Sequence, residues 1–521
     1  MDNSYWISSW IRNKKEYPKL VEDRVEEIVI IGGGLTGLTA AYYLTKAGKQ
    51  VVLLEKNKIC NSASGNTTAK VTSQHGLFYN YLLQSVGRTE AKQYLEANEM
   101  AIKNIAKIIE EEKIECDFEW QDAYVFTQSE KDVEKIKKEV QALEYLNFSC
   151  EFTNNIEVPI KEKQKERNEN HINIQKKVLG AIKFKNQAQF NPCLYAQGLA
   201  NKIEERGGKI FENSKVIDIK KEANYYEVIT EDAKIKAKKV VIASHYPIIN
   251  APGFYFMKMY QVTSYLIATE VNEALFEGMY INSEDPTISL RTAKYKDKRL
   301  LLVGGMDHKT GAKIDLKGSY KKLEEVAKQL YPDAKVLYRW NTEDCISLDK
   351  IPYIGEFSNL WPNVYVGTGY KKWGMTTSNV AANIITDKIL GKENPYEEVF
   401  KSKRLKPLKN YEELGNMLKE VGYSAIINKL EKIDEYVKDV KQGEGKIVEI
   451  EGKKVGVYRN EEGKAYIVKP YCTHLGCELS WNNLDKTWDC PCQGSRFTYE
   501  GKSIYNPAIK DLERLDIYKN K

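Results

Sequence analysis

Three glycines near the start of the chain have a spacing that suits the binding of a pyrophosphate. Gly32, Gly34 and Gly37 form a G-x-G-x-x-G motif. In such a motif the first glycine allows a tight turn, the second lets a pyrophosphate approach the backbone, and the third lets a helix pack closely on a strand. Glu55 follows Gly37 by 18 residues, where its carboxylate can accept hydrogen bonds from an adenosine ribose. The pattern predicts a dinucleotide site.

The residues around this motif predict the strand–helix–strand unit that such a site needs. Residues 28–31 and 51–54 are apolar runs typical of strands buried on both faces, and residues 35–47 carry a helix between them. The N-terminus of that helix offers unpaired N–H groups and a partial positive charge to phosphates. The predicted cofactor-binding residues in this unit are Gly32, Gly34, Leu35, Thr36, Gly37, Glu55 and Lys56. The motif alone does not separate FAD from NAD.

A second group of chemically active residues lies near the end of the chain. Four of the nine cysteines fall within residues 472–492, together with His474, and the other five are scattered singly. Sulfur and imidazole are metal-binding donors, so this stretch is a second candidate functional site. One alternative is zinc bound by the four cysteines, although their C-x4-C and C-x-C spacings are unlike those of common zinc knuckles.

Length and composition set the broad class. A chain of 521 residues with 42% hydrophobic and 29% charged residues predicts two or three globular domains. The formal charge of +6 is spread along the chain and gives no support to nucleic-acid binding. The sequence has no apolar run of 18 residues to span a membrane and no secretory signal. The five scattered cysteines suit a reducing compartment, so we predict a cytoplasmic protein.

Two further stretches make residues 25–395 resemble a known family. Residues 61–76 are small and polar and include Thr68, and residues 364–378 repeat the strand, glycine turn and helix pattern with Gly369, Met375 and Thr376. With the first motif they resemble the FAD-dependent oxidoreductases of the D-amino-acid oxidase, glycine oxidase and sarcosine oxidase superfamily. The resemblance implies FAD, a backbone contact to adenine at Val216, and Gly369, Met375 and Thr376 close to the flavin ring.

The C-terminal residues resemble a Rieske [2Fe–2S] domain. The resemblance implies that Cys472, His474 and Cys490 bind iron and that Cys477 and Cys492 form a disulfide. Gln493 occupies the position of the family's second histidine ligand, and an amide is a poor ligand for iron. A metal-free Rieske-like module is therefore an alternative.

The sequence patterns and the two resemblances together imply an α/β fold (α+β overall) in four parts. The parts are an N-terminal extension (1–24), a Rossmann-like FAD domain with an antiparallel substrate sheet (25–400), a basic helical linker (401–442) and an all-β Rieske-like domain (443–521). Residues 81–112 show the periodicity of one long helix, and the polar residues 160–175 indicate a solvated loop.

The predicted activity is an FAD-dependent oxidation. Hydride would leave a small amine or amino-acid-like substrate, and electrons would pass to the Rieske centre and then to a redox carrier protein. Alternatives are an oxygen-using oxidase with a structural tail, and an electron-transfer or interaction flavoprotein without its own substrate. Arg291 lies in an apolar stretch, where it could clamp a substrate carboxylate or form an internal ion pair.

Overall fold

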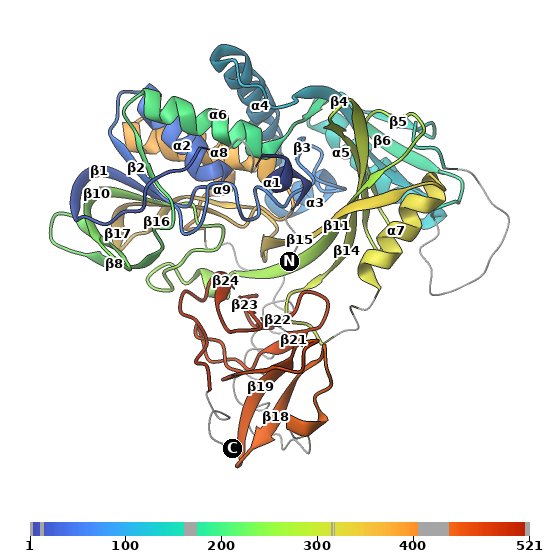
Figure 1. The fold of residues 1–521 in the computed structure, drawn as a ribbon. Helices are drawn as coiled ribbons and strands as arrows, with labels where there is room; N and C mark the ends of the chain where they lie inside the picture. The colour runs from blue at the N-terminus through green and yellow to red at the C-terminus, as the bar shows by residue number, and fades with distance from the viewer. Residues whose placement is uncertain are drawn as a thin grey trace.

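A computed structural model describes residues 4–10, 15–160, 174–313, 316, 318–404 and 437–515. Most of the predicted loop at 160–175 and of the predicted linker at 401–442 lies outside these residues. Two large sheets lie next to each other with helices above them, and a smaller β-rich domain lies below (Figure 1). The predicted α/β class with a separate β-rich C-terminal region is confirmed.

The first sheet is the dinucleotide-binding unit expected around the glycine motif. Its order is β16-β17-β10-β1-β2-β7, with the β8–β9 pair attached to β10. The pairs joining β17, β10, β1, β2 and β7 are parallel, which requires both faces to be covered and explains the apolar runs. The strands are β1 (Arg24–Ile31), β2 (Val51–Leu54), β7 (Lys209–Phe211), β8 (Val216–Lys221), β9 (Tyr226–Thr230), β10 (Lys234–Ile242), β16 (Tyr353–Ser358) and β17 (Trp361–Thr368).

Three helices, α2 (Leu35–Lys46), α6 (Pro192–Glu205) and α8 (Gly374–Leu390), pack together over this sheet (Figure 1). The short helix α1 (Tyr5–Trp10) belongs to the same core, because Tyr5 and Trp6 are buried in it. The predicted N-terminal extension is thus packed into the flavin domain. The single helix predicted at 81–112 is wrong: Gly87, at φ 86°, separates α3 (Tyr79–Val86) from α4 (Arg88–Glu112).

The second sheet is the expected antiparallel one, in the order β15-β11-β14-β13-β12-β4-β6-β3, with β5 paired to β6. Only the β12–β4 pair is parallel among its described strand pairs. The strands are β3 (Lys70–Val71), β4 (Glu119–Thr127), β5 (Glu151–Thr153), β6 (Gly180–Gln189), β11 (Met259–Glu270), β12 (Met279–Asn282), β13 (Ile288–Tyr295), β14 (Lys298–Lys309) and β15 (Lys335–Ser347). Helices α5 (Glu130–Tyr145) and α7 (Ser319–Leu330) and the 3₁₀ turn η2 (Tyr255–Met257) pack on this sheet, whereas α9 (Glu397–Phe400) packs against α4 and against β16 of the first sheet.

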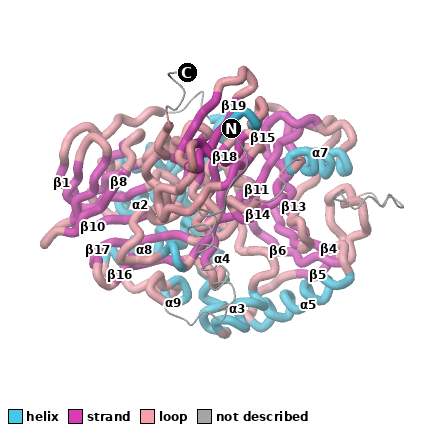
Figure 2. Tube along the Cα trace, turned by 90° about the horizontal axis from the view of Figure 1, so that it is seen from below, coloured by secondary structure: helices cyan, strands magenta, loops and turns pink. Residues whose placement is uncertain are grey.

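The C-terminal domain consists of two small antiparallel sheets. Seen from below, β18 and β19 lie in front of the junction between the two large sheets (Figure 2). Its elements are η4 (Val437–Asp439), β18 (Gly445–Ile450), β19 (Lys453–Arg459), β20 (Ala465–Val468), β21 (Ser480–Asn482), β22 (Thr487–Asp489), β23 (Arg496–Thr498) and β24 (Ser503–Tyr505). No helix in the described parts of the chain is long and apolar enough to cross a bilayer.

Candidate functional site

A cavity of about 610 Å³ lies between the two large sheets and extends to the C-terminal domain. Of the twelve residues predicted to bind the cofactor, nine line it: Gly32, Gly34, Leu35, Thr36, Glu55, Lys56, Thr68, Val216 and Met375. The other three lie behind this wall. Gly37 lies where α2 packs closely on β1, and Gly369 forms a turn with φ 76°. The Thr376 hydroxyl donates a hydrogen bond to the Thr72 carbonyl at 3.1 Å.

The glycine motif is shaped as its sequence predicts. Gly32 has φ 113°, and a Cβ there would lie 2.4 Å from the Ala243 carbonyl oxygen. A Cβ at Gly37 would lie 2.0 Å from the Gly32 carbonyl oxygen, so α2 and β1 approach too closely for any side chain. Gly34 is the N-cap of α2 and supplies no side-chain cap, and the Leu35 N–H donates to the Ser64 hydroxyl at 3.1 Å. The N-terminus of α2 lies at the cavity wall, where its partial positive charge suits a phosphate.

Around the carboxyl ends of β2 and β10, polar groups fit a nucleotide. Glu55 accepts N–H hydrogen bonds from Gly33 at 2.7 Å and Asn57 at 2.8 Å, and burial raises the pKa of its carboxyl. His245 also lines the cavity, and its buried Nε2 has no hydrogen-bond partner among the described residues. Burial lowers the pKa of His245 to about 4, so the ring is neutral. An orphaned ring nitrogen in a polar cavity fits a bound polar ligand.

The end of the cavity formed by the second sheet holds charged groups that the sequence did not identify. The carboxylates of Asp307 and Asp344 and the ammonium of Lys372 line it, and Lys372 pairs with Asp307 at 3.0 Å. Burial raises the pKa of Asp344 to about 7, although nearby Lys372 opposes the shift. Lys70 also lies here, and burial lowers the pKa of its ammonium.

Arg291 does not have the predicted role of a substrate clamp. Its side chain is 2% exposed and is not part of the cavity lining. Its Nη1 donates to the carbonyls of Thr68 at 2.8 Å and Ala69 at 2.6 Å, and its guanidinium lies 5.2 Å from the centre of the Trp6 ring. The internal ion pair that was the alternative for Arg291 is not formed among the described residues either, because backbone carbonyls rather than a carboxylate accept its hydrogen bonds. Arg291 therefore fixes the backbone at Thr68, which itself lines the cavity.

The strands β11 and β15 form a wall shared by the cavity and the C-terminal domain. They pair antiparallel, and side chains along each alternate between faces. Ser264 and Asp344 face the cavity. On the other face, Gln261 donates to the carbonyls of Gln493 at 2.8 Å and Asn506 at 2.7 Å. The second sheet is thus covered on this face by the Rieske-like domain.

A buried arginine fixes this contact. Arg496 is fully buried, and its Nη1 pairs with Glu343 of β15 at 2.7 Å. Its remaining nitrogens pair within the C-terminal domain with Asp485 at 2.6 Å and Asp489 at 2.9 Å. Glu343 also accepts hydrogen bonds from Thr263 and Thr310. If the domains separated, the buried Arg496 would lose its partner on β15, at a cost in free energy.

The C-terminal domain also contributes to the cavity itself. Tyr505, Asn506 and Ile509 are part of the cavity lining. Lys56, a predicted cofactor-binding residue, donates from Nζ to the Ile504 carbonyl at 2.7 Å, and burial lowers its pKa to about 8. The dinucleotide-binding unit and the C-terminal domain therefore meet at the same cavity.

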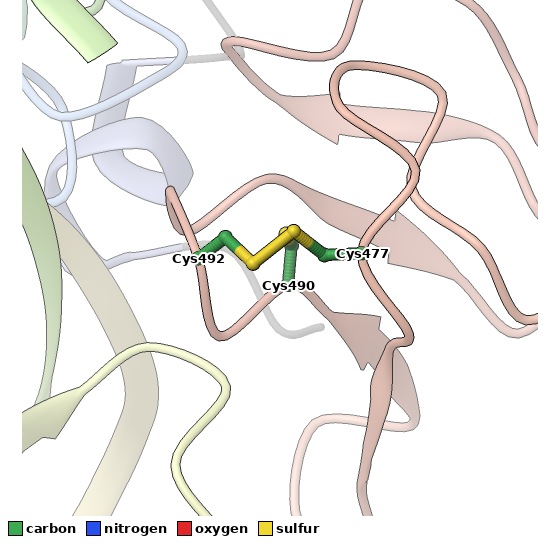
Figure 3. A group of neighbouring side chains, drawn as sticks. All are labelled: Cys477, Cys490 and Cys492. Atoms are coloured by element: carbon green, nitrogen blue, oxygen red, sulfur yellow. A yellow bond between two sulfur atoms is a disulfide. The ribbon is translucent and has the colours of Figure 1, made fainter. Parts of the chain in front are cut away.

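The predicted disulfide between Cys477 and Cys492 is present. The Cys490 side chain lies beside it, and the three sulfur atoms are within 4.8 Å of one another (Figure 3). Because the disulfide removes two of the four cysteines, the zinc alternative loses half of its thiolates. The disulfide instead ties together the two loops that carry the predicted iron ligands.

Three of the predicted iron ligands fit a cluster. A hydrogen bond from the Cys490 thiol lowers the pKa of Cys472, so their sulfurs are adjacent. His474 Nε2 donates to Asn250 Oδ1 at 2.5 Å, and its buried Nδ1 has no hydrogen-bond partner among the described residues. Burial lowers the pKa of His474 to about 4, which leaves a neutral ring with a free Nδ1 lone pair. Two sulfurs and this nitrogen are the donor types that a Rieske cluster requires.

Gln493, at the fourth position, is 1% exposed and already has a partner. Its amide Oε1 accepts a hydrogen bond from the Tyr246 hydroxyl at 2.8 Å. Tyr246 follows β10 in the flavin domain, next to His245. The side chain that replaces the second histidine therefore connects the two domains.

Comparison with known proteins agrees with this architecture. A family model described as FAD dependent oxidoreductase (DAO) matches residues 27–388. The chain belongs to this family. A Rieske [2Fe-2S] domain model matches residues 432–518 of this oxidoreductase. The first domain implies FAD and the second implies a [2Fe–2S] cluster.

A Rieske 2Fe-2S iron-sulfur protein of Bacillus subtilis (strain 168), YhfW, is 38% identical over 99% of this chain and 97% of its own. The gamma-glutamylputrescine oxidoreductase of Escherichia coli (strain K12) is 24% identical over 75% of this chain and 89% of its own. The crystal structure of glycine oxidase from Geobacillus kaustophilus aligns with a TM-score of 0.60 at 17% identity, covering 73% of this chain and 99% of that one. This last likeness concerns the fold alone.

Proposed function

We propose that this FAD-dependent oxidoreductase oxidises a small amine and passes the electrons to its own Rieske centre, which delivers them to a redox carrier protein. When bound, FAD accepts hydride and releases electrons singly, and the cluster accepts one electron at a time. The carrier and a cytoplasmic location remain predictions. The E. coli relative is named for an amine substrate, which supports the substrate class.

One observation carries the proposal: residues of both domains line a single cavity. Asn506 lies on that cavity and donates to the carbonyls of Ser244 and Tyr246, both at 3.2 Å. Gln493, in one of the two predicted cluster loops, also accepts a hydrogen bond from Tyr246. This loop therefore lies against the segment that follows β10, which also carries His245 of the nucleotide site. This arrangement favours short-range electron transfer within one chain over a tail that acts elsewhere.

Residues of this chain would prepare the site for the reaction. The N-terminus of α2 would hold the pyrophosphate, and the neutral ring of His245 would bind through Nε2. Cys472, Cys490 and His474 Nδ1 would bind the irons, and the hydroxyl of Ser495 lies close enough to lower the pKa of Cys472. The fused domain excludes bulk water from one wall of the cavity.

A second function, an oxygen-using oxidase with a structural tail, is favoured by one feature. Gln493 cannot act as imidazole does, and its oxygen is engaged by Tyr246. A cluster with three protein ligands would be less stable than a Cys₂His₂ cluster, and the Arg496 contacts would hold the domain in place without iron.

Steady-state assays of the purified full-length protein would distinguish the two functions. A panel of alkylamines would be tested with ferricenium, a one-electron acceptor, and separately with dioxygen. We expect ferricenium-dependent turnover that falls at least tenfold in Cys472→Ser while FAD content is unchanged. Equal rates with dioxygen in both proteins would instead support the oxidase.

A further inference from the structure

The substrate end of the cavity contains two carboxylates, and one of them has no cation paired to it. Asp307 is paired with Lys372 at 3.0 Å. Asp344 lines the same cavity, and no ion pair within 4.0 Å joins it to any residue that the structure describes. Carboxylates withdrawn from bulk water need a cationic partner or a proton. A bound ligand could supply that partner.

The position of Asp344 places it where a substrate would lie. The cavity runs from the first sheet, with Gly34 and Glu55, to the second sheet, with Ser264 and Asp344. Since a glycine turn of this type would hold the pyrophosphate and Glu55 would lie near the ribose, the second sheet would face the remaining part of the bound cofactor. Lys372 belongs to the turn that leads into α8, so the charged cluster is built from three separate elements: β14, β15 and this turn.

Lysine is the only cationic side-chain type in the cavity lining among the described residues, and a lysine binds a carboxylate as a point charge rather than through two parallel hydrogen bonds. Lys70 Nζ donates to the Tyr280 carbonyl at 3.2 Å and to the Ser289 hydroxyl. Lys371 lies over the Phe78 ring at 4.6 Å, and burial lowers its pKa to about 8. No arginine lines the cavity among the described residues, since Arg291 serves the backbone behind it. A bidentate clamp for an α-amino acid carboxylate is therefore missing from this wall.

We propose that Asp344 is a catalytic residue that binds the ammonium group of the substrate and accepts one of its protons, and that the substrate is an alkylamine without a carboxylate beside the amine. This inference rests on the proposed function above. Asp307 and Lys372 act as positioning residues, because their ion pair fixes one side of the ammonium site and leaves the Asp344 carboxylate for the ligand.

The reaction balances with groups that the protein and its flavin provide. The Asp344 carboxylate takes a proton from R–CH₂–NH₃⁺, which leaves a neutral amine and a carboxylic acid. The electron pair of the C–H bond would then leave with its hydrogen as hydride, for which FAD, when bound, would be the acceptor, and the nitrogen lone pair would form the C=N bond of R–CH=NH₂⁺. Only a neutral amine has that lone pair, so proton removal must precede oxidation. A base whose pKa is near 7 suits this transfer at neutral pH.

A titration without turnover tests the proposal directly. tert-Butylamine carries the ammonium charge but has no hydrogen on the carbon bonded to nitrogen, so it cannot be oxidised. Pivalate has the same shape and the opposite charge. Both would be titrated into full-length oxidised protein, with binding followed by the visible spectrum of the bound flavin. We expect wild-type protein to bind tert-butylamine at least tenfold more tightly than pivalate, and the reverse preference would overturn the proposal without any variant.

Two variants of adjacent residues then locate the site. Asp344→Asn should weaken tert-butylamine binding at least tenfold and leave FAD content unchanged. Glu343→Gln, which removes a carboxylate from the opposite face of the same strand, should leave that affinity within twofold. Unchanged affinity in a flavin-loaded Asp344→Asn protein would also overturn the proposal. Because the titration needs no electron transfer, failure here is distinct from failure of the flavin-to-cluster proposal.

Discussion

Glu343 and Asp344 are consecutive residues of β15 whose side chains lie on opposite faces of one sheet: Glu343 pairs with Arg496 of the Rieske domain, and Asp344 lines the flavin cavity. Strand alternation alone produces this arrangement. A single strand therefore supports both the docking of the second domain and the substrate end of the first.

Removing Arg496 should separate the two domains. Arg496→Met leaves Glu343, Asp485 and Asp489 buried without their cation, and breaking such a network costs about 3–5 kcal/mol. Thermal unfolding should show an earlier, separate transition for the C-terminal domain. Arg514→Met serves as the control, because it removes an arginine whose ion pair with Glu500 is exposed and lies within the C-terminal domain. A single transition at the wild-type temperature in Arg496→Met would show that the network does not hold the domains together.

Asp344 should give the protein two pH dependences of opposite sign. Amine binding needs the ionised Asp344 carboxylate, so the affinity for tert-butylamine should rise as the pH rises through the Asp344 pKa of about 7. The other charged groups that face this site, Lys372 and Asp307, are paired with each other. Folding behaves differently. The folded pKa lies above the ordinary value near 4, so the folded state retains the proton longer and the free energy of unfolding falls as pH rises between these values. Both trends should flatten in Asp344→Asn, and an unchanged binding profile would contradict the assignment.

Arg291→Lys should reduce stability and spare substrate recognition. Lysine cannot reproduce the donation of one guanidinium to the Thr68 and Ala69 carbonyls, and unsatisfied buried carbonyls cost about 1–3 kcal/mol. We expect a lower melting temperature and weaker FAD retention with KM for the amine within twofold. A large rise in KM at normal FAD content would restore the substrate-clamp role.

Gln493→His should improve the iron site. Wild-type protein is expected to contain less than two irons per chain after aerobic purification, because the amide is a poor ligand and is held by Tyr246. The histidine variant should gain iron and the electron-paramagnetic signal of a Cys₂His₂ cluster after anaerobic reconstitution. Tyr246→Phe is the matched control, since it frees the glutamine without adding an imidazole. Two irons per wild-type chain with a typical Rieske signal would refute the prediction.

The sequence was most informative where chemistry requires particular residues at fixed spacing. The glycine turn, with Gly32 at φ 113°, and the Cys477–Cys492 disulfide are both specified locally, by steric limits on side chains and by two short loops. A helix boundary was missed at Gly87, because the apolar periodicity continues on both sides of the residue that breaks the helix.

The substrate end could not be predicted, because its charges come from distant segments. Asp307, Asp344 and Lys372 meet only when β14, β15 and the turn before α8 pack together. Arg291 was misassigned for a related reason: an apolar neighbourhood indicates burial but not the partner, and here the partners are backbone carbonyls more than 200 residues away in the sequence. Residues 341–346 read NTEDCI and show no alternation of apolar and polar residues, so no local pattern separated Glu343 from Asp344.

Rapid-freeze electron-paramagnetic resonance on the full-length protein tests most directly whether the flavin and the cluster form one electron-transfer unit. The oxidised protein would be mixed anaerobically with an amine that the screen identifies as a substrate, and samples frozen at successive times. The account predicts that a reduced iron–sulfur signal appears as the flavin absorbance falls, in proportion to the iron content, and is absent in Cys472→Ser. Complete bleaching of the flavin while the iron centre stays oxidised would contradict it.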